Sequence, residues 1–155
     1  MSLNKPAKEI VVDLFNAHYK QSLAYATVTL SEPEVMPYDA PRNTRVVMDS
    51  AVGDAPLTNP FPLYYDRVNL TAVAYNQLGS QTIVPQLEDE GFTTTIDLLP
   101  QLNALLQTQL DENDIVSDPL PAGLTYPKNV VVRVKPTSLA YLGSLSLMLT
   151  DNVQS

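Results

Sequence analysis

The first periodic segment lies near the start of the chain, where apolar residues recur at helical spacing. Its apolar stripe consists of Ile10, Val11, Leu14 and Phe15. This spacing predicts an amphipathic helix over about residues 6–19, with Pro6 in its first turn and charged residues such as Asp13 on the opposite face. Two interpretations of the stripe stay open: it packs on the rest of the chain, or it docks residues 1–22 on a neighbouring subunit.

A second helical pattern lies in the middle of the chain. Leucines at positions 98, 102, 105 and 106 line one face of a predicted helix around residues 96–110. Pro100 lies deeper than a first turn, so it either kinks this helix or starts a new one after a short turn. A shorter helix is predicted over residues 70–76, with Asn69 as its cap.

Alternating patterns predict a β-hairpin at the C-terminal end. Within residues 129–135 and 141–150, valines and leucines alternate with polar residues, which gives one buried and one wetter face. Further strands are predicted over residues 23–30, 43–48, 61–68 and 81–86. The predicted fold class is therefore α+β, mainly antiparallel β-hairpins with an N-terminal amphipathic helix and a central helix. Residues 23–155 would form a single β-rich domain.

Two strand entries along the chain resemble each other. Tyr38-x-x-Pro41-Arg42-Asn43 precedes one Val-rich strand, and Tyr126-Pro127-Lys128-Asn129 precedes another. Either shared turn chemistry or an internal duplication explains the match. A duplication would make the domain a pair of related hairpin halves.

Residues 31–41 (SEPEVMPYDAP), called the arm below, contain three prolines. This density excludes a helix or a central strand, so the arm is predicted to be a surface projection or a stiff connector. The apolar residues Val35, Met36 and Tyr38 lie on it. Together with Ile10, Val11, Leu14 and Phe15 of the helical stripe, they are the candidate interface residues.

Composition narrows the classes of partner. The chain has 155 residues and 45% apolar content, enough for one domain with a core. Nine basic and 17 acidic residues give a net charge of −8, which argues against nucleic acid and against an anionic membrane surface as partners. The polar start and the lack of any apolar run near the roughly 20 residues of a membrane span predict a soluble protein made in the cytoplasm.

The sequence contains no catalytic or ligand-binding motif. The absence of Cys excludes disulfides and thiol nucleophiles, and a single histidine, His18, weakens metal and triad chemistry. No phosphate-binding, dinucleotide or nucleophile-elbow pattern occurs. The acidic cluster at residues 111–114 lacks the glycine and distal glutamate of a calcium loop, and we interpret it as a helix cap. We therefore predict no catalytic, cofactor-binding or metal residues, no cofactor and no enzymatic activity.

Four segments of the chain together resemble a family of small virion structural proteins of large tailed bacteriophages. They are Tyr64-Tyr65-Asp66-Arg67-Val68-Asn69-Leu70, Thr95-Ile96-Asp97-Leu98-Leu99-Pro100-Gln101-Leu102-Asn103, Asp114-Ile115-Val116 and Ser138-x-x-Tyr141-x-Gly143-Ser144. The resemblance covers roughly residues 41–150. It implies a non-enzymatic part of a phage particle, assembled in the host cytoplasm, whose partners are other virion proteins and copies of itself.

Three hypotheses follow. The first is a virion subunit for head decoration or for the neck, tail or baseplate, acting through symmetric contacts. It predicts that a chain without residues 1–22 still folds but no longer joins the particle. The second is an adhesion module that binds a receptor or glycan through exposed tyrosines such as Tyr64 and Tyr65. The third, a small hydrolase, needs two carboxylates flanking a cleft.

Overall fold

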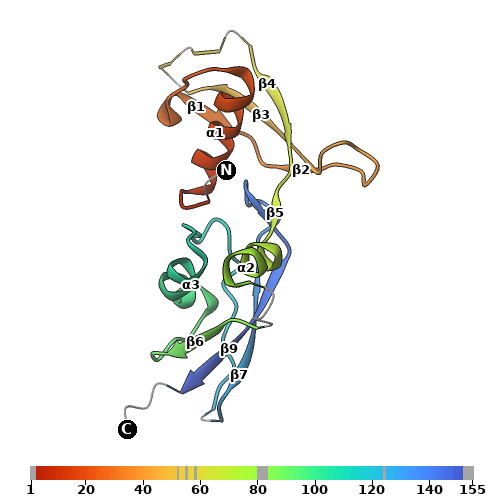
Figure 1. Cartoon of the computed structure of the whole chain (residues 1–155). Helices are drawn as coiled ribbons and strands as arrows, with labels where there is room; N and C mark the ends of the chain where they lie inside the picture. The colour runs from red at the N-terminus through yellow and green to blue at the C-terminus, as the bar shows by residue number, and fades with distance from the viewer. Residues whose placement is uncertain are drawn as a thin grey trace.

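The computed structural model describes residues 3–51, 53–54, 56–57, 59–79, 84–123 and 125–151. It shows an elongated molecule with two lobes placed end to end (Figure 1). Each lobe combines helix and sheet around its own cluster of buried apolar side chains. The predicted α+β class, with its N-terminal helix and predominantly antiparallel strands, is confirmed.

The sheet of the first lobe is built around β3 (Thr44–Ser50). On one side β3 pairs antiparallel with β4 (Phe61–Tyr65), and on the other with β1 (Val28–Leu30) and then β2 (Glu34–Val35). The strand predicted from residue 23 starts only at Val28, because η1 (Tyr25–Thr27) is a 3-10 turn. The Tyr25 hydroxyl there donates to Asp13 at 2.7 Å, which holds the turn against the first helix.

Helix α1 (Ala7–Tyr19) lies on this sheet and contributes to both cores. Val11, Val12 and Phe15 are buried in the first lobe. Ala7 and Ile10, one turn earlier, are buried in the second. The two cores therefore share one helix, and the division between them falls near Arg67 rather than after residue 22.

The sheet of the second lobe has β9 (Ser144–Asp151) in its centre. The strand β7 (Lys128–Arg133) pairs with it antiparallel, so the predicted hairpin is confirmed, and valines of β7 oppose leucines of β9 on the buried face. The strand β6 (Gln86–Asp89) joins the other edge in parallel. Residues 81–83 of the strand predicted over 81–86 lie outside the described residues.

Two helices cover the inner face of this second sheet (Figure 1). Helix α2 (Leu70–Leu78) starts where predicted, and the Asn69 side chain accepts a hydrogen bond from the Thr71 amide at 2.9 Å. The central helix is split into η2 (Thr95–Leu98) and α3 (Leu99–Leu106). Pro100 lies in the first turn of α3, where its missing N–H costs nothing, so the new-helix alternative is the one observed.

Helix α3 ends four residues before the predicted position 110. The Asn103 side chain bonds both the N–H and the C=O of Leu110, at 2.8 and 2.9 Å, and accepts from the Thr108 hydroxyl. These bonds satisfy the backbone of the following loop and so stabilise a turn in place of further helix. Alternation and helical periodicity do not reveal such a competing bond.

The two similar strand entries lead to different positions in their sheets. The first leads to β3, which has neighbours on both edges, and the second leads to β7, whose named strand partner is β9 alone. The internal duplication remains a prediction.

Candidate interaction site

The apolar stripe of α1 is covered by the chain itself. Ile10, Val11 and Phe15 are buried, and Leu14 is half-buried. As candidate interface residues Ile10, Val11 and Phe15 are therefore corrected: the fold uses them for its two cores, which is the first of the two interpretations of the stripe, whereas Leu14 packs against the first core and keeps part of its side chain accessible. Removing residues 1–22 would take buried side chains from both cores, and the folding of residues 23–155 on their own stays a prediction.

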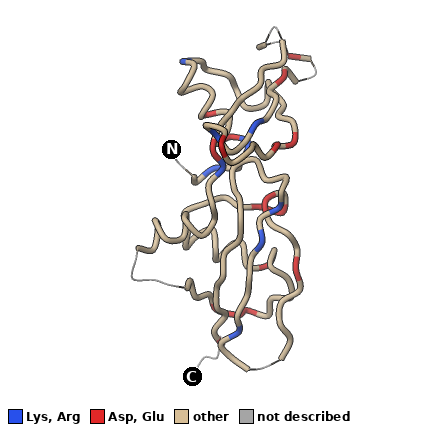
Figure 2. The backbone as a smooth tube through the Cα atoms, turned by 90° about the vertical axis from the view of Figure 1, so that its right-hand side faces the viewer, with Lys and Arg blue, Asp and Glu red and all other residues tan. Residues whose placement is uncertain are grey.

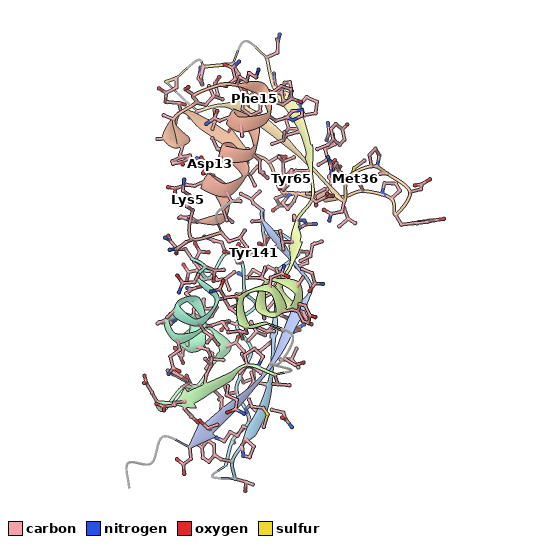
Figure 3. The ribbon with its side chains drawn as sticks, viewed as in Figure 1. Lys5, Asp13, Phe15, Met36, Tyr65 and Tyr141 are labelled. Atoms are coloured by element: carbon pink, nitrogen blue, oxygen red, sulfur yellow. The ribbon has the colours of Figure 1, made fainter. Side chains whose placement is uncertain are left out.

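The arm does project from the body. Between β2 and β3 the chain leaves the first lobe sideways as an ordered loop (Figures 1 and 3). Val35 is 76% exposed and Tyr38 is 103% exposed, so neither side chain finds cover in its own chain. Met36 is half-buried at the base of the arm, close to the body (Figure 3). These three candidate residues thus lie on one accessible feature.

Two hollows open beside the arm and meet at Arg42 and Tyr64. The first, called the arm-base hollow, has a volume of about 240 Å³ and an apolar surface, and is lined by Met36, Ala40, Pro41, Arg42 and Tyr64. The second, called the aromatic groove, has a volume of about 530 Å³ and is lined by Leu14, His18, Tyr19, Arg42, Leu63, Tyr64, Tyr65 and Asp66. It runs between the C-terminal half of α1 and strand β4.

Consecutive tyrosines of β4 point to opposite sides, as strand geometry requires. Tyr64 is 50% exposed and lines both hollows, whereas Tyr65 is buried and its hydroxyl donates to the Leu139 carbonyl. Beside the groove, the ring of Tyr19 packs edge-to-face on Phe61, with ring centroids 5.1 Å apart. Phe61 shares the inward face of β4 with Tyr65, so Tyr64 is not part of this aromatic pair and is exposed on the opposite face of the strand.

Ion pairs surround this site without concentrating one sign of charge. Arg42 bonds Asp66 at 3.0 Å, and Arg45 bonds Glu34 at 2.9 Å. The Asp39 carboxylate beside Tyr38 has no such bond to another described residue. Over the rest of the molecule, basic and acidic residues are interspersed along its length (Figure 2).

A buried polar junction joins the two lobes. The guanidinium of Arg67, which is 3% exposed, donates to the Thr44 hydroxyl and to the carbonyls of Pro136 and Ser138 at 2.8–3.0 Å. The Ser138 hydroxyl in turn donates to buried Asp114 at 2.7 Å. Burial raises the pKa of the Asp114 carboxyl, although the hydrogen bond from Ser138 acts in the opposite direction. Burial also lowers the pKa of the Arg67 guanidinium. The junction is closed, so its chemistry is structural.

Metal-binding groups and membrane-spanning helices are two other features that the described residues could provide. Within the described ranges, no group of three or more His, Asp or Glu residues is arranged to hold a metal ion. The same part of the chain has no helix with the length and apolar content needed to cross a bilayer. What the arm and the two hollows can do is bind a partner through apolar, aromatic and charge contacts.

The sequence identified the arm but not the hollows. Tyr19, Arg42 and Tyr64 were not among the candidate interface residues, since they come from three segments that only the fold brings together. The one available signal was alternation in residues 61–65, which puts Tyr64 and Tyr65 on opposite faces.

Comparison with known proteins leads to one family. The model of a family described as "Family of unknown function (DUF7941)" matches residues 1–155, and the chain belongs to that family. No curated protein and no solved structure matches the chain. The family carries no assigned function, so the resemblance to tailed-phage virion proteins stays a prediction.

Proposed function

We propose that this DUF7941 protein is a non-enzymatic structural component of a tailed-phage particle, and that it acts through repeated protein–protein contacts. The observation that supports the proposal is the ordered arm, which bears the exposed apolar side chains of Val35, at its base in β2, and of Tyr38, in the loop that follows. A fully accessible tyrosine on a stiffened projection buries no surface within its own chain. A subunit that meets neighbours gains an anchor whose conformational entropy is already restricted.

The closed interior agrees with this function. Arg67 and Asp114 are the buried charged residues of the described chain, and both are used in the junction between the lobes. The apolar stripe of α1 is likewise used inside the molecule. We assign the contacts with other proteins to the arm and the hollows beside it, where exposed apolar and aromatic side chains lie together. Symmetry and copy number would supply the strength that one small surface lacks.

Quantitative peptide mass spectrometry on gradient-purified phage particles tests the proposal. We expect the protein to co-sediment with the particles and to be present in a fixed copy number. Hundreds of copies would indicate head decoration or tail tiling, and a small multiple set by ring symmetry would indicate the neck, baseplate or fibres. A signal no higher than that of contaminating host proteins would overturn the proposal.

The alternative, an adhesion module for a receptor or glycan, is favoured by one observation. Tyr64 is exposed in a groove with Tyr19 and His18, a setting in which an aromatic ring can stack on a sugar face. The burial of Tyr65 removes half of the tyrosine pair on which this hypothesis was based. Binding of the purified protein to a glycan array, lost on Tyr64→Ala, would support it over the structural function.

A further inference from the structure

We propose that the arm and the arm-base hollow are the two halves of one self-complementary contact with a second copy of this chain. In this contact Tyr38 of each copy enters the hollow at the base of the other copy's arm. The inference deepens the proposed function and rests on it, because a repeated subunit needs a contact with its own kind. Three features of the arm carry it.

The arm is ordered before any partner binds. At its base, β2 pairs with β3 through Glu34↔Arg45 and Val35↔Thr44, and the Met36 amide donates to the Asn43 carbonyl at 2.9 Å. At its outer end the Ala40 amide donates to the Pro37 carbonyl at 2.9 Å. Three prolines further restrict the backbone. Binding through the arm therefore costs little conformational entropy.

The arm-base hollow suits an aromatic side chain. Its volume is about 240 Å³, its surface is apolar, and the ring of Tyr64 forms one wall. Tyr38 lies between Met36 and Ala40, which line the same hollow, yet it is 103% exposed and so does not fill it in its own chain. The arm thus presents an unfilled apolar hollow and an unburied aromatic ring within a few residues of each other.

Such closeness favours a second copy as the occupant. In a twofold arrangement each protomer uses the same patch, so the residue that inserts and the residues that receive it must belong to one continuous surface, as they do here. The charges agree with this arrangement. Asp39 follows Tyr38 and has no ion pair with another described residue, and Arg42 lines the hollow with a largely exposed side chain held by one exposed ion pair, to Asp66. A ring inserted from a second copy would carry its Asp39 toward Arg42 of the partner subunit.

Backbone pairing at the neighbouring sheet edge is a poorer alternative. Both the N–H and the C=O of Val47 bond Ser31 on the β1 side of β3. Pro62 of β4 lies opposite Val47 in the β3–β4 pairing, so its backbone groups face away from β3, toward the open edge of β4. Proline has no N–H to donate there. This edge resists strand addition, which leaves side-chain insertion as the mode of contact.

The contact is expected to be weak. The arm and its two hollows provide fewer residues than the roughly 20–30 per side of a standard interface. We therefore expect a dissociation constant on the order of 10–100 µM, which would serve a subunit held by many contacts.

Sedimentation equilibrium of the full chain from about 5 µM to about 500 µM tests the inference. We expect a reversible monomer–dimer equilibrium that Tyr38→Ser weakens at least tenfold. The matched control is Tyr75→Ser, which alters another exposed tyrosine (57%) on α2 of the other lobe and should leave the equilibrium unchanged. A monomer over the whole range, or equal weakening by both variants, would overturn the inference and leave the arm to a different protein.

A cross-linking measurement tests the geometry, because the natural chain has no cysteine. Mixing Asp39→Cys protein with Arg42→Cys protein under mild oxidation should give a disulfide-linked heterodimer. Asp39→Cys mixed with Tyr75→Cys should give far less. Equal yields would overturn the twofold arrangement. This result is independent of the particle measurement. If the protein is monomeric in solution but present in purified particles, only the self-contact is refuted. If it dimerises in solution but is absent from particles, only the proposed function is refuted.

Discussion

Replacing Arg67 by Met should destabilise the protein strongly, although the side chain touches no solvent-exposed site. The guanidinium binds Thr44 of the first lobe and the carbonyls of Pro136 and Ser138 of the second. Methionine fills much of the same space but donates no hydrogen bond. Arg67→Met therefore leaves three oxygens at the junction without their donor.

The magnitude follows from two opposing contributions. Each hydrogen bond from a charged donor contributes about 1.5–3 kcal/mol, so losing three costs roughly 4–9 kcal/mol. Removing the buried cation recovers several kcal/mol of desolvation, all the more since the Nη2 atom of Arg67 is buried without a partner among the described residues. The net loss should be about 3 kcal/mol, a large part of the roughly 5–15 kcal/mol typical of a folded protein.

Urea unfolding followed by far-ultraviolet circular dichroism measures this loss. At a slope of about 2 kcal/mol per molar urea, a loss of 3 kcal/mol lowers the midpoint by roughly 1.5 M. The control is Arg133→Met, which removes an exposed arginine paired with Asp118 and should shift the midpoint far less. Hydrogen exchange should also speed up at the Ser138 amide, which bonds the Lys135 carbonyl in the junction loop.

Two results would refute this reasoning. If Arg67→Met were as stable as the wild type, the desolvation of the guanidinium would equal or exceed the value of its three bonds. If Arg67→Met and Arg133→Met were destabilised equally, loss of positive charge from an acidic chain would explain both. Arg67→Lys separates charge from geometry: it keeps the cation but not the planar fork, so it should also be destabilised.

Two further predictions concern the pH dependence of stability and a close backbone approach. Burial raises the pKa of the Asp114 carboxyl above its ordinary 3.8, so the wild type should lose stability as pH rises from about 4 through that raised pKa. Asp114→Asn keeps an acceptor for the Ser138 hydroxyl but has no carboxyl to ionise, so its urea midpoint should fall less over the same pH range. Parallel pH profiles of the two proteins would contradict this. Gly143→Ala should lower the free energy of unfolding by about 2 kcal/mol more than Gly91→Ala does, as measured by thermal unfolding. Both glycines have positive φ, but a Cβ at position 143 would lie 2.7 Å from Nδ2 of Asn69, the cap of α2. Equal losses would show that the Asn69 side chain moves aside freely.

The local structure could largely be predicted from the sequence, since it depends on local chemistry. The cap at Asn69, the helix start at Pro100 and the alternation in β7 and β9 each involve residues close together in the chain. The pairing of β6 with β9 is parallel and joins residues about 60 positions apart. Neither alternation nor turn chemistry specifies such a partner.

The same distinction applies to the candidate site. The arm was evident from its prolines and exposed apolar residues, which are properties of one segment. The hollows were not, because Tyr19, Arg42 and Tyr64 come from α1, the end of the arm and β4. Arg67 could not be recognised as buried, because an arginine is most often exposed, and two of its three acceptors, Pro136 and Ser138, lie some 70 residues further on.

The position of α1 also bears on how the chain folds during synthesis. The helix is synthesised long before β9, yet Ala7 and Ile10 belong to a core whose members include Leu145, Leu147 and Leu149 of that strand. Until β9 emerges, this part of the helix has no completed core to enter, and its apolar face stays available to chaperones or to other nascent chains. The buried residues of the first core all lie between Val11 and Tyr65, so that lobe can close early, whereas the second lobe cannot close over Ala7 and Ile10 until β9 is available.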